Sequence, residues 1–178
     1  MGALLDMFIR GLRLLEKLFP TSGDKPVVPP VEPPVQLPVP PPPPIIPSTL
    51  QAKRLELLVA HNRFRAEVGA DKLMEMAALS SVAQQQASYL ARNLITNNLH
   101  GRPTGRTMEG DFKSAGIKYR IAGENAAAGQ RTTVDVMADW KASRGHYANI
   151  MNPAYLYVGF GYATASTGKV YWVTMFCG

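Results

Sequence analysis

The stretch IAGENAAAG, residues 121–129, places one glutamate, Glu124, inside a run of small and apolar residues that ends on a glycine. A surface loop would carry more polar neighbours. Inside a protein, a carboxylate costs free energy unless another group compensates its charge. The stretch therefore predicts a strand, at about 118–128, whose glutamate is paired with residues from elsewhere in the chain.

The elements expected around this strand come as helices first and paired strands last. Ser48 or Thr49, Thr107, and Thr132 or Thr133 are suitable N-cap residues. In the first helix, apolar and polar positions recur at helical spacing: Leu55, Leu58, Val59, Asn62 and Arg65. The order predicts an α+β fold ending in an antiparallel hairpin. The helices are expected at about 49–68, 76–97, 107–116 and 132–143, and the hairpin strands at 155–163 and 169–176.

The charge of the chain is concentrated in its larger part. The chain has 178 residues and a net charge of +6. Residues 1–50 are neutral, whereas residues 51–178 hold fifteen basic and nine acidic side chains. This excess favours anionic surroundings such as envelope polymers or lipid headgroups. It is too small and too scattered to predict a nucleic-acid partner, so none is expected.

The single cysteine is Cys177, next to the last residue of the sequence. One cysteine makes no internal disulfide, so the fold has to be held by its core. Two interpretations stay open for Cys177: a small apolar residue in the last strand, or an intermolecular disulfide.

Residues 1–19 predict an amphipathic helix over about 3–19. Asp6, Arg10, Arg13 and Lys17 form one stripe at helical spacing, and large apolar residues fill the opposite face. Such a helix is expected to bind a membrane surface or a protein partner, to self-associate into a homo-oligomer, or to dock on its own domain. No apolar run is long enough to span a bilayer, and the start lacks the pattern of a signal peptide.

Residues 20–47 contain 13 of the 15 prolines. Proline fixes φ and has no backbone N–H, so this segment cannot form a helix or an inner strand. It predicts a semi-rigid, extended Pro-rich linker between the helix at 3–19 and a domain at 48–178. The layout suggests an anchor, a stalk and a head.

The domain at 48–178 carries several motifs in a distinctive order. They are HNRFR at 61–65, His100, AGENAAAG at 122–129, a tryptophan helix ending in S-x-G-H at 143–146, NIMNP at 149–153, and VGFGYA followed by YWV. In this respect the domain resembles the CAP superfamily, also called SCP-like domains, in its disulfide-free bacterial branch. The resemblance covers about residues 52–177. It implies an α-β-α sandwich with a mostly antiparallel central sheet.

The resemblance also implies a site. In the family, two histidines and one or two glutamates meet in a surface cleft, and by motif these are His100, Glu124 and His146. Imidazole nitrogens and a carboxylate can bind a divalent metal such as zinc, or one imidazole can act as a base. The three residues are thus candidate metal ligands and candidate catalytic residues. A purely structural hydrogen-bond network is the alternative.

The sequence departs from the family at one position. Many eukaryotic members have a second glutamate three residues after the tryptophan, where this chain has Ser143. Asp139 lies on the wrong side of Trp140 to replace it. Hydrolysis by a complete set of four residues is therefore in doubt. His61 is expected to be structural, Asn125 to bind backbone groups, and Trp140, Trp172, Tyr155, Tyr157 and Tyr162 to lie wholly or partly in the core.

Three functions stay open from the sequence. The first is an anchored CAP-domain module on a proline stalk that binds an envelope, lipid or anionic polymer ligand in the cleft. The second is a structural component of a larger assembly, such as a virion or secretion particle, with the helix at 3–19 inserted in a partner subunit. The third is a metal-dependent hydrolase acting on cell wall or peptide. The resemblance implies a cell-envelope or extracellular location; virion association is the alternative.

Overall fold

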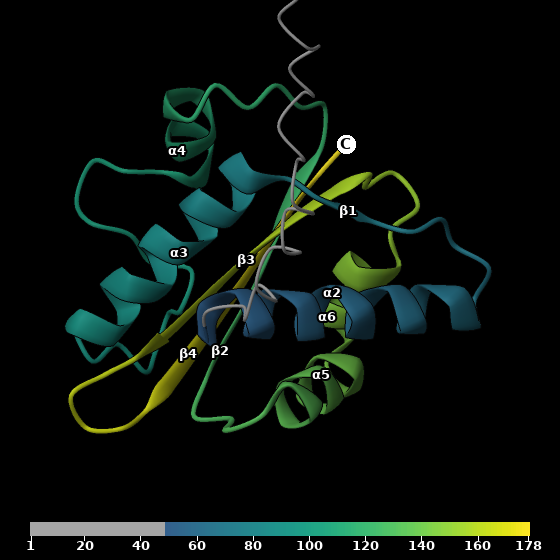
Figure 1. Cartoon of the computed structure of the whole chain (residues 1–178). Helices are drawn as coiled ribbons and strands as arrows, with labels where there is room; N and C mark the ends of the chain where they lie inside the picture. Colours follow the sequence, from purple (N-terminus) through teal and green to yellow (C-terminus); the bar gives the residue numbers. More distant parts are fainter. Residues whose placement is uncertain (1–48) are drawn as a thin grey trace, which may run out of the picture. The chain divides into compact units, whose positions relative to one another are not determined.

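The computed structural model describes residues 49–178, and the helix expected at 3–19 and the linker at 20–47 lie outside them. Within this range, single or paired helices are separated by strands, and two strands end the chain (Figure 1). The helices are α2 (Thr49–Glu67), α3 (Ala77–Arg92), α4 (Met108–Ser114), α5 (Thr133–Ala142) and α6 (Arg144–Met151). The strands are β1 (Met74–Glu75), β2 (Ala122–Ala128), β3 (Tyr157–Thr164) and β4 (Val170–Cys177).

The four strands form one mixed sheet in the order β1-β3-β4-β2. β4 pairs antiparallel with both β3 and β2, whereas the two-residue β1 runs parallel to β3. Glu124 lies opposite Met175 on β4. The sheet is thus mostly antiparallel, as predicted, and β2, which carries Glu124, is one of its edges.

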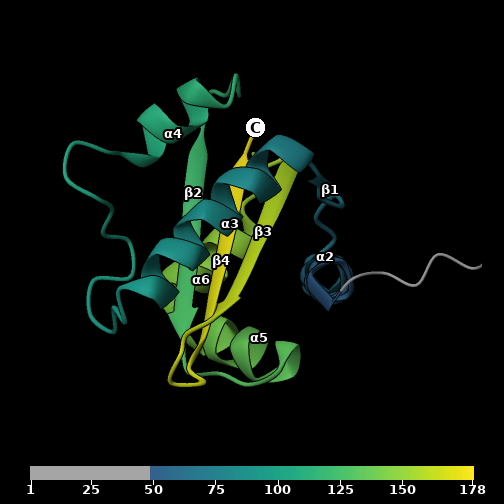
Figure 2. The same ribbon diagram turned by 60° about the vertical axis from the view of Figure 1, so that its left-hand side comes forward.

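Helices cover both faces of the sheet. β4 is buried along its whole length, and its side chains alternate between two core clusters. Tyr171, Val173 and Met175 pack with α3 and α4. Trp172 and Phe176 pack with α2, α5 and α6. Figure 2 shows α3 and α4 on one side of the sheet and α2 and α5 on the other. This is the predicted α-β-α sandwich.

The close packing of α3 on the sheet depends on two glycines of the VGFGYA stretch. A Cβ at Gly159 would lie 2.2 Å from the backbone carbon of Leu79, and one at Gly161 would lie 2.1 Å from the carbonyl oxygen of Ala83. No real side chain tolerates such distances. Glycine at both positions lets the helix lie directly on β3.

Polar side chains of α2 and α3 bind the backbone N–H and C=O groups of β3 that the short β1 leaves unpaired. Gln84 binds both backbone groups of Tyr162, at 3.1 Å and 2.9 Å. Ser80 accepts a hydrogen bond from the Phe160 amide, and Arg54 donates one to the Phe160 carbonyl. Because buried backbone groups need partners, these residues close the sheet edge without a further strand.

The helix starts agree with the sequence. The side chain of Thr107 accepts a hydrogen bond from the amide of Gly110 and caps α4. Thr132 and Asp135 form a reciprocal capping box at α5. In α2, however, the buried residues are Leu57, His61 and Arg65, and Leu55 and Val59 are exposed.

Two boundaries differ clearly from the prediction, and two elements were not expected. The α3 helix ends at Arg92 and not at 97, because Leu94 adopts a left-handed conformation with φ 51°. The β2 strand begins at Ala122 and not at 118. The segment expected as a loop before Pro153 contains α6, and β1 was not expected because two residues give no periodic signal. The α6 helix ends at Met151, two residues before Pro153, because proline disfavours helical backbone in the residue that precedes it.

The expected core residues are largely confirmed. His61, Trp140, Trp172 and Tyr155 are buried, and Cys177 is a buried residue of β4 with a free thiol. Tyr157 and Tyr162 are partly buried. None of the helices within residues 49–178 combines the length and the apolar character that a bilayer-spanning segment needs.

Candidate functional site

The three predicted site residues come from three different elements and meet at the edge strand. Glu124 lies on β2, His100 lies in the loop between α3 and α4, and His146 lies on α6. His100 follows the end of α3 by eight residues, because α3 ends at Arg92 and not near 97. The rings of His100 and His146 have centroids 6.4 Å apart. The two helical layers therefore contribute one imidazole each beside a carboxylate of the sheet.

The carboxylate of Glu124 is fully paired. One oxygen, Oε1, lies 2.8 Å from Nδ1 of His100, and Oε2 accepts a hydrogen bond from the guanidinium of Arg102. The Glu124 side chain is only 5% exposed, so an unpaired charge there would be costly. Arg102, which the sequence did not single out, therefore answers the question raised by the AGEN motif together with His100.

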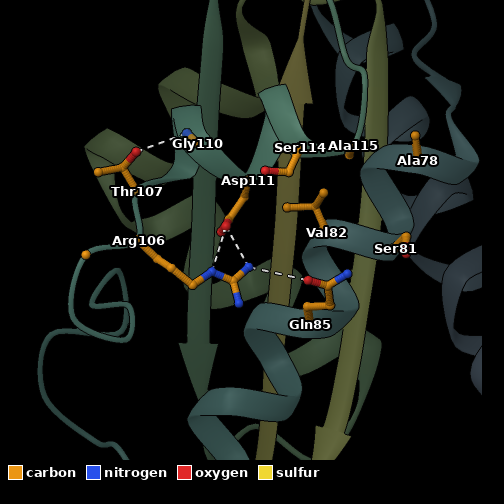
Figure 3. A pocket seen from close by; sticks show the side chains of 11 residues that line it. Ala78, Ser81, Val82, Gln85, Arg106, Thr107, Gly110, Asp111, Ser114 and Ala115 are labelled. Atoms are coloured by element: carbon orange, nitrogen blue, oxygen red, sulfur yellow. Dashed lines mark hydrogen bonds and ion pairs between the residues drawn. The ribbon is translucent and has the colours of Figure 1, made fainter.

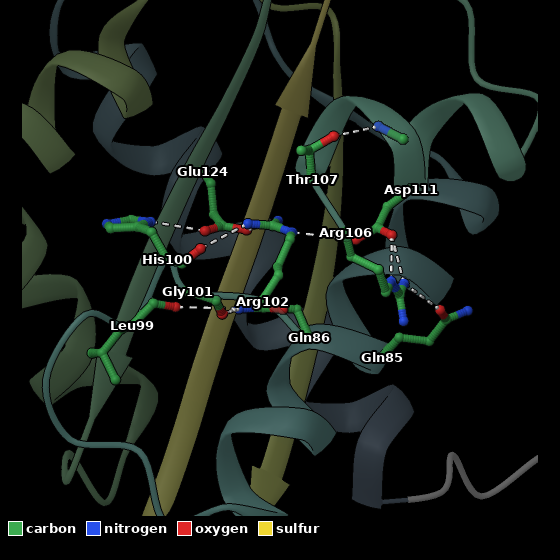
Figure 4. Close-up of polar contacts among 11 residues, drawn as sticks. Gln85, Gln86, Leu99, His100, Gly101, Arg102, Arg106, Thr107, Asp111 and Glu124 are labelled. Carbon is green, nitrogen blue, oxygen red and sulfur yellow. Dashed lines mark hydrogen bonds and ion pairs between the residues drawn. The ribbon is translucent and has the colours of Figure 1, made fainter. Parts of the chain in front are cut away.

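Arg102 belongs to a chain of alternating charges (Figure 4). Its Nε lies 3.2 Å from Oδ2 of Asp111, and the other oxygen of Asp111 binds Arg106. The side chains of Arg102 and Asp111 are 7% and 8% exposed, whereas that of Arg106 is 46% exposed. Opposite charges thus alternate from His100 through Glu124, Arg102 and Asp111 to Arg106.

The loop that carries His100 is held by its carbonyl groups. The buried amide of Gln86 on α3 donates hydrogen bonds to the carbonyls of Leu99 (3.3 Å) and Gly101 (2.8 Å). Arg102 donates one to the carbonyl of His100 itself (3.0 Å). Three successive carbonyls are therefore bound by two buried side chains, which fixes the position of the imidazole between them.

His146 is positioned from β2. The side-chain amide of Asn125 donates a hydrogen bond to the His146 carbonyl (3.0 Å), confirming that this asparagine binds backbone. Asn149 donates to Asn125 Oδ1 (2.9 Å) and to the carbonyl of Glu124 (3.2 Å). These contacts tie α6 to the edge strand, so the position of the second imidazole follows from the AGEN motif as well.

The two imidazoles are expected to differ in protonation. The hydrogen bond to Glu124 raises the pKa of His100 above its ordinary value, although partial burial opposes this. Burial, reinforced by the nearby His100, lowers the pKa of His146. Near pH 6.5 the site thus favours one protonated and one neutral ring side by side.

Two of the three candidate metal ligands, His100 and Glu124, already bind each other. Among residues 49–178 no group of three or more His, Cys, Asp and Glu side chains is placed to hold one. Both oxygens of Glu124 and Nδ1 of His100 are already engaged, and the Arg102 cation occupies the position at Oε2. The assignment of His100, Glu124 and His146 as metal ligands therefore stays a prediction.

No second carboxylate replaces the missing family glutamate in the arrangement described. Ser143 lies at the junction of α5 and α6 and makes no capping bond with its side chain. Asp139 accepts a hydrogen bond from Gln130 (2.7 Å) instead of entering the site. Among residues 49–178, Glu124 is the only residue whose carboxylate binds the His100 ring.

The sequence signal for Arg102 and Asp111 was weak. Arg102 stands two residues after His100, in the stretch HGR, and Asp111 is the one acidic residue buried in α4. An arginine beside a candidate histidine is a cue that a buried glutamate elsewhere has a cationic partner. Nothing local connects Arg102 to Asp111, because that contact depends on how the loop folds back on α4.

A known protein family matches most of the described residues. The model of the CAP cysteine-rich secretory protein family matches residues 58–176. The chain belongs to the CAP family. A curated relative of this CAP protein is YkwD of Bacillus subtilis (strain 168), itself uncharacterized, with 32% identity over 132 residues. The match covers 74% of the chain but 49% of YkwD, so the chain spans about half the length of that relative.

Solved structures share the fold of the CAP domain. An extracellular SCP-domain protein of Bacillus anthracis str. Ames superposes with a TM-score of 0.64 at 20% identity, covering 75% of this chain and 44% of the other. An outer surface protein of Borrelia burgdorferi gives 0.60 at 20% identity, covering 68% and 88%. NaASP2, solved with Zn²⁺, gives 0.51 at 13% identity, covering 74% and 83%. At these identities the likeness concerns the fold.

Proposed function

We propose that this CAP-domain chain is a non-enzymatic binding module of the cell surface or extracellular space, which holds an anionic group of an envelope component between His100 and His146. The location is supported by structural relatives described as an extracellular protein and an outer surface protein. The ligand class is supported by the basic excess of residues 51–178.

The observation that carries the proposal is the complete pairing of Glu124. Because Arg102 and His100 each bind one of its oxygens, the charge of the carboxylate is already compensated and a further cation gains little there. The His100 side chain is 54% exposed, and its Nδ1 faces Glu124, so Nε2 is the ring donor left for a ligand. A protonated His100 beside a neutral His146 suits a phosphate or carboxylate that accepts from both rings.

The same pairing disfavours hydrolysis as the function of this site. A general base needs a lone pair that reaches the proton it removes. The Glu124 side chain is 5% exposed and its charge is already compensated by Arg102 and His100, and Ser143 stands where a second glutamate would act. His146 alone would lack an orienting carboxylate, since in this arrangement the Glu124 side chain is directed to His100 and Arg102.

Display of the module is part of the proposal and depends on sequence pattern alone. Residues 20–47 would act as the stalk and residues 3–19 as the contact with a membrane surface or a protein partner. Insertion of residues 3–19 into a larger assembly is the competing outcome. Mild detergent separates the two, because it releases a membrane contact and leaves an assembly contact in place. A chain lacking residues 1–19 is the control, since it should lose either contact.

The test is co-sedimentation of the full-length chain with two probes at pH 6.0 and pH 8.0. One probe is isolated bacterial cell wall with its anionic polymers, beside the same wall after acid extraction of those polymers. The other is vesicles of phosphatidylcholine with about a third phosphatidylglycerol, which gives the surface a negative potential. Both probes present phosphate. Testing them separately therefore distinguishes a wall polymer from a lipid headgroup as the source of the anionic group.

We expect binding to one of these probes that weakens as the pH rises through the elevated pKa of His100. His100→Asn and His146→Asn should each weaken it about five- to tenfold, the effect of losing one charge-assisted hydrogen bond. Tyr147→Phe, on the same helix as His146, is the matched control and should bind as the unmodified chain does. Binding to neither probe, or binding unaffected by both histidine variants, would rule out the proposed site.

A further inference from the structure

A hollow lies between α3 and α4, and Arg106 and Asp111 are among the residues that line it (Figure 3). Its volume is about 520 Å³, within the size range of small-molecule sites. Small residues on the facing helices and the preceding loop leave the space open: Ala78, Gly105, Gly110 and Ala115. The hollow exists because these side chains are too short to fill the gap between two helices.

The rim of this hollow is polar and combines donors with acceptors. Ser81 and Gln85 line it from α3, and Ser114 and Arg106 line it from α4 and the loop before it. Arg106 is held in place by Asp111 and by the side-chain oxygen of Gln85 (3.4 Å). Among residues 49–178, Nη1 of Arg106 and Nε2 of Gln85 have no hydrogen-bond partner, so both remain available to a ligand.

The charges next to the hollow cancel. The cations Arg102 and Arg106 face the carboxylates of Asp111 and Glu124 in alternation, and Asp111 is bound on both oxygens. An ionic ligand therefore gains little there from net attraction. A neutral ligand that both donates and accepts hydrogen bonds fits such a set of paired planar groups and hydroxyls better.

We infer that the α3–α4 hollow is a subsite for a neutral saccharide. Sugar hydroxyls would bond Ser81, Gln85, Ser114 and the free edge of Arg106, and the C–H face of a ring would pack on Ala78 and Val82. Because Asp111 binds Arg106 at this subsite and Arg102 at the histidine site, both subsites share one carboxylate. This inference relies on the proposed function only in taking the ligand to be an envelope component; it specifies that the component is a glycan.

The test uses the full-length chain, labelled with ¹⁵N and followed by two-dimensional NMR. The probes are N,N′-diacetylchitobiose and maltose, each titrated to about 50 mM, which would nearly saturate even a site with a Kd of about 10 mM. We expect one of them to shift the signals of residues 78–85 and 105–115, including the Gln85 side-chain amide, in a saturable way. Glucuronate, a charged monosaccharide, should bind no better than the neutral probes.

The variant is the double substitution Ser81→Ala and Ser114→Ala, and the matched control is Ser166→Ala in the exposed β3–β4 loop. Ser81 and Ser114 are exposed, and within residues 49–178 neither side chain makes a hydrogen bond, so the double variant should keep the spectrum of a folded protein. We expect its Kd to rise about tenfold or more, at about fivefold for each hydrogen bond removed, and the control to match the unmodified chain.

Three results would overturn the inference: no saturable shift with either neutral probe, equal binding by the double variant, or binding of glucuronate alone. The result is independent of the histidine site. Saccharide binding that survives His146→Asn, with no binding to walls or vesicles, would refute the proposed function and keep this subsite. The reverse pattern would refute the subsite and keep the proposed function.

Discussion

Two of the three histidines of the domain lie in opposite surroundings. His61 is completely buried on α2, with its ring centroid 5.7 Å from Trp140 and 5.2 Å from Phe160. His100 lies on a loop with about half of its side chain exposed. Burial lowers the pKa of His61 to about 4, whereas the hydrogen bond to Glu124 raises that of His100. One imidazole is therefore kept neutral inside the core and the other is favoured as a cation at the surface.

The polar groups around the two rings are arranged differently as well. Near His61, the buried Arg65 binds the backbone carbonyls of residues 71, 150, 152 and 155 and so joins α2 to the end of α6. Near His100, Arg102 binds two carboxylates as well as a carbonyl. The comparison shows that one arginine serves the packing of helices and the other the charge of an exposed site.

The largest effect is expected from Arg65→Met. It leaves several buried carbonyls without a donor, so the free energy of unfolding should fall by about 3–5 kcal/mol. Urea unfolding followed by tryptophan fluorescence measures the change. Arg63→Met, at an exposed position of the same helix, is the control and should change it by less than about 0.5 kcal/mol. A loss for Arg65→Met as small as the control would remove the structural role given to this arginine.

The next effect concerns His61 and pH. Its folded pKa of about 4 is below the ordinary 6.5, so between these values the unfolded chain binds a proton that the folded chain does not. Stability should therefore fall as the pH drops from 6.5 towards 4, by about 3 kcal/mol from this group. Urea midpoints at half-unit steps of pH measure the slope. In His61→Phe the slope over this window should be clearly shallower; an unchanged slope would assign it to other groups.

A smaller loss is expected from Arg102→Met. Glu124 and Asp111 would each lose a partner but keep His100 and Arg106, so we expect a loss of about 2 kcal/mol, less than at Arg65. The variant should also raise the pKa of His100 further, because the Arg102 charge lowers it in the unmodified chain. NMR titration of the ring protons measures this shift. A fall in the pKa of His100 would contradict the assigned charge chain.

The smallest effect on stability is expected from Glu124→Gln, which preserves the shape of the side chain. The pKa of His100 should fall, since the hydrogen bond to the carboxylate is the largest cause of its elevation. The pKa of His61, at the opposite face of the sheet, should stay where it is. The same titration reports both rings at once, and a parallel shift of His61 would indicate a general change of structure.

The sequence was most informative where structure is decided locally. Thr107 and Thr132 identified two helix starts because a capping side chain acts within three residues. The glycines of VGFGYA lay in a correctly expected strand, although their role in admitting α3 needed the packed structure. The α6 helix was missed because Gly145 and Asn149 weaken its helical signal and no side-chain hydrogen bond caps its start.

For the candidate site, the sequence supplied the histidines and the glutamate through the family resemblance. It did not supply Arg102, Gln86 or Asp111, because their partners lie 9 to 22 residues away or bind through backbone carbonyls. Local pattern carries no information about such contacts. The sequence therefore indicated which side chains gather at the edge strand but not which of their atoms remain free, and that second point decides the chemistry.

The alternating chain of charges has a consequence for how related proteins can diverge. Replacing one of its buried members leaves each neighbour with one partner fewer, so single substitutions at Arg102, Asp111 or Glu124 should be less common than paired ones among stable relatives. Paired substitutions remove both charges together and avoid that cost. An alignment of relatives should therefore show correlated exchange between positions 102 and 124 and between 106 and 111, a covariation pattern that the buried His61 position would not share with any of them.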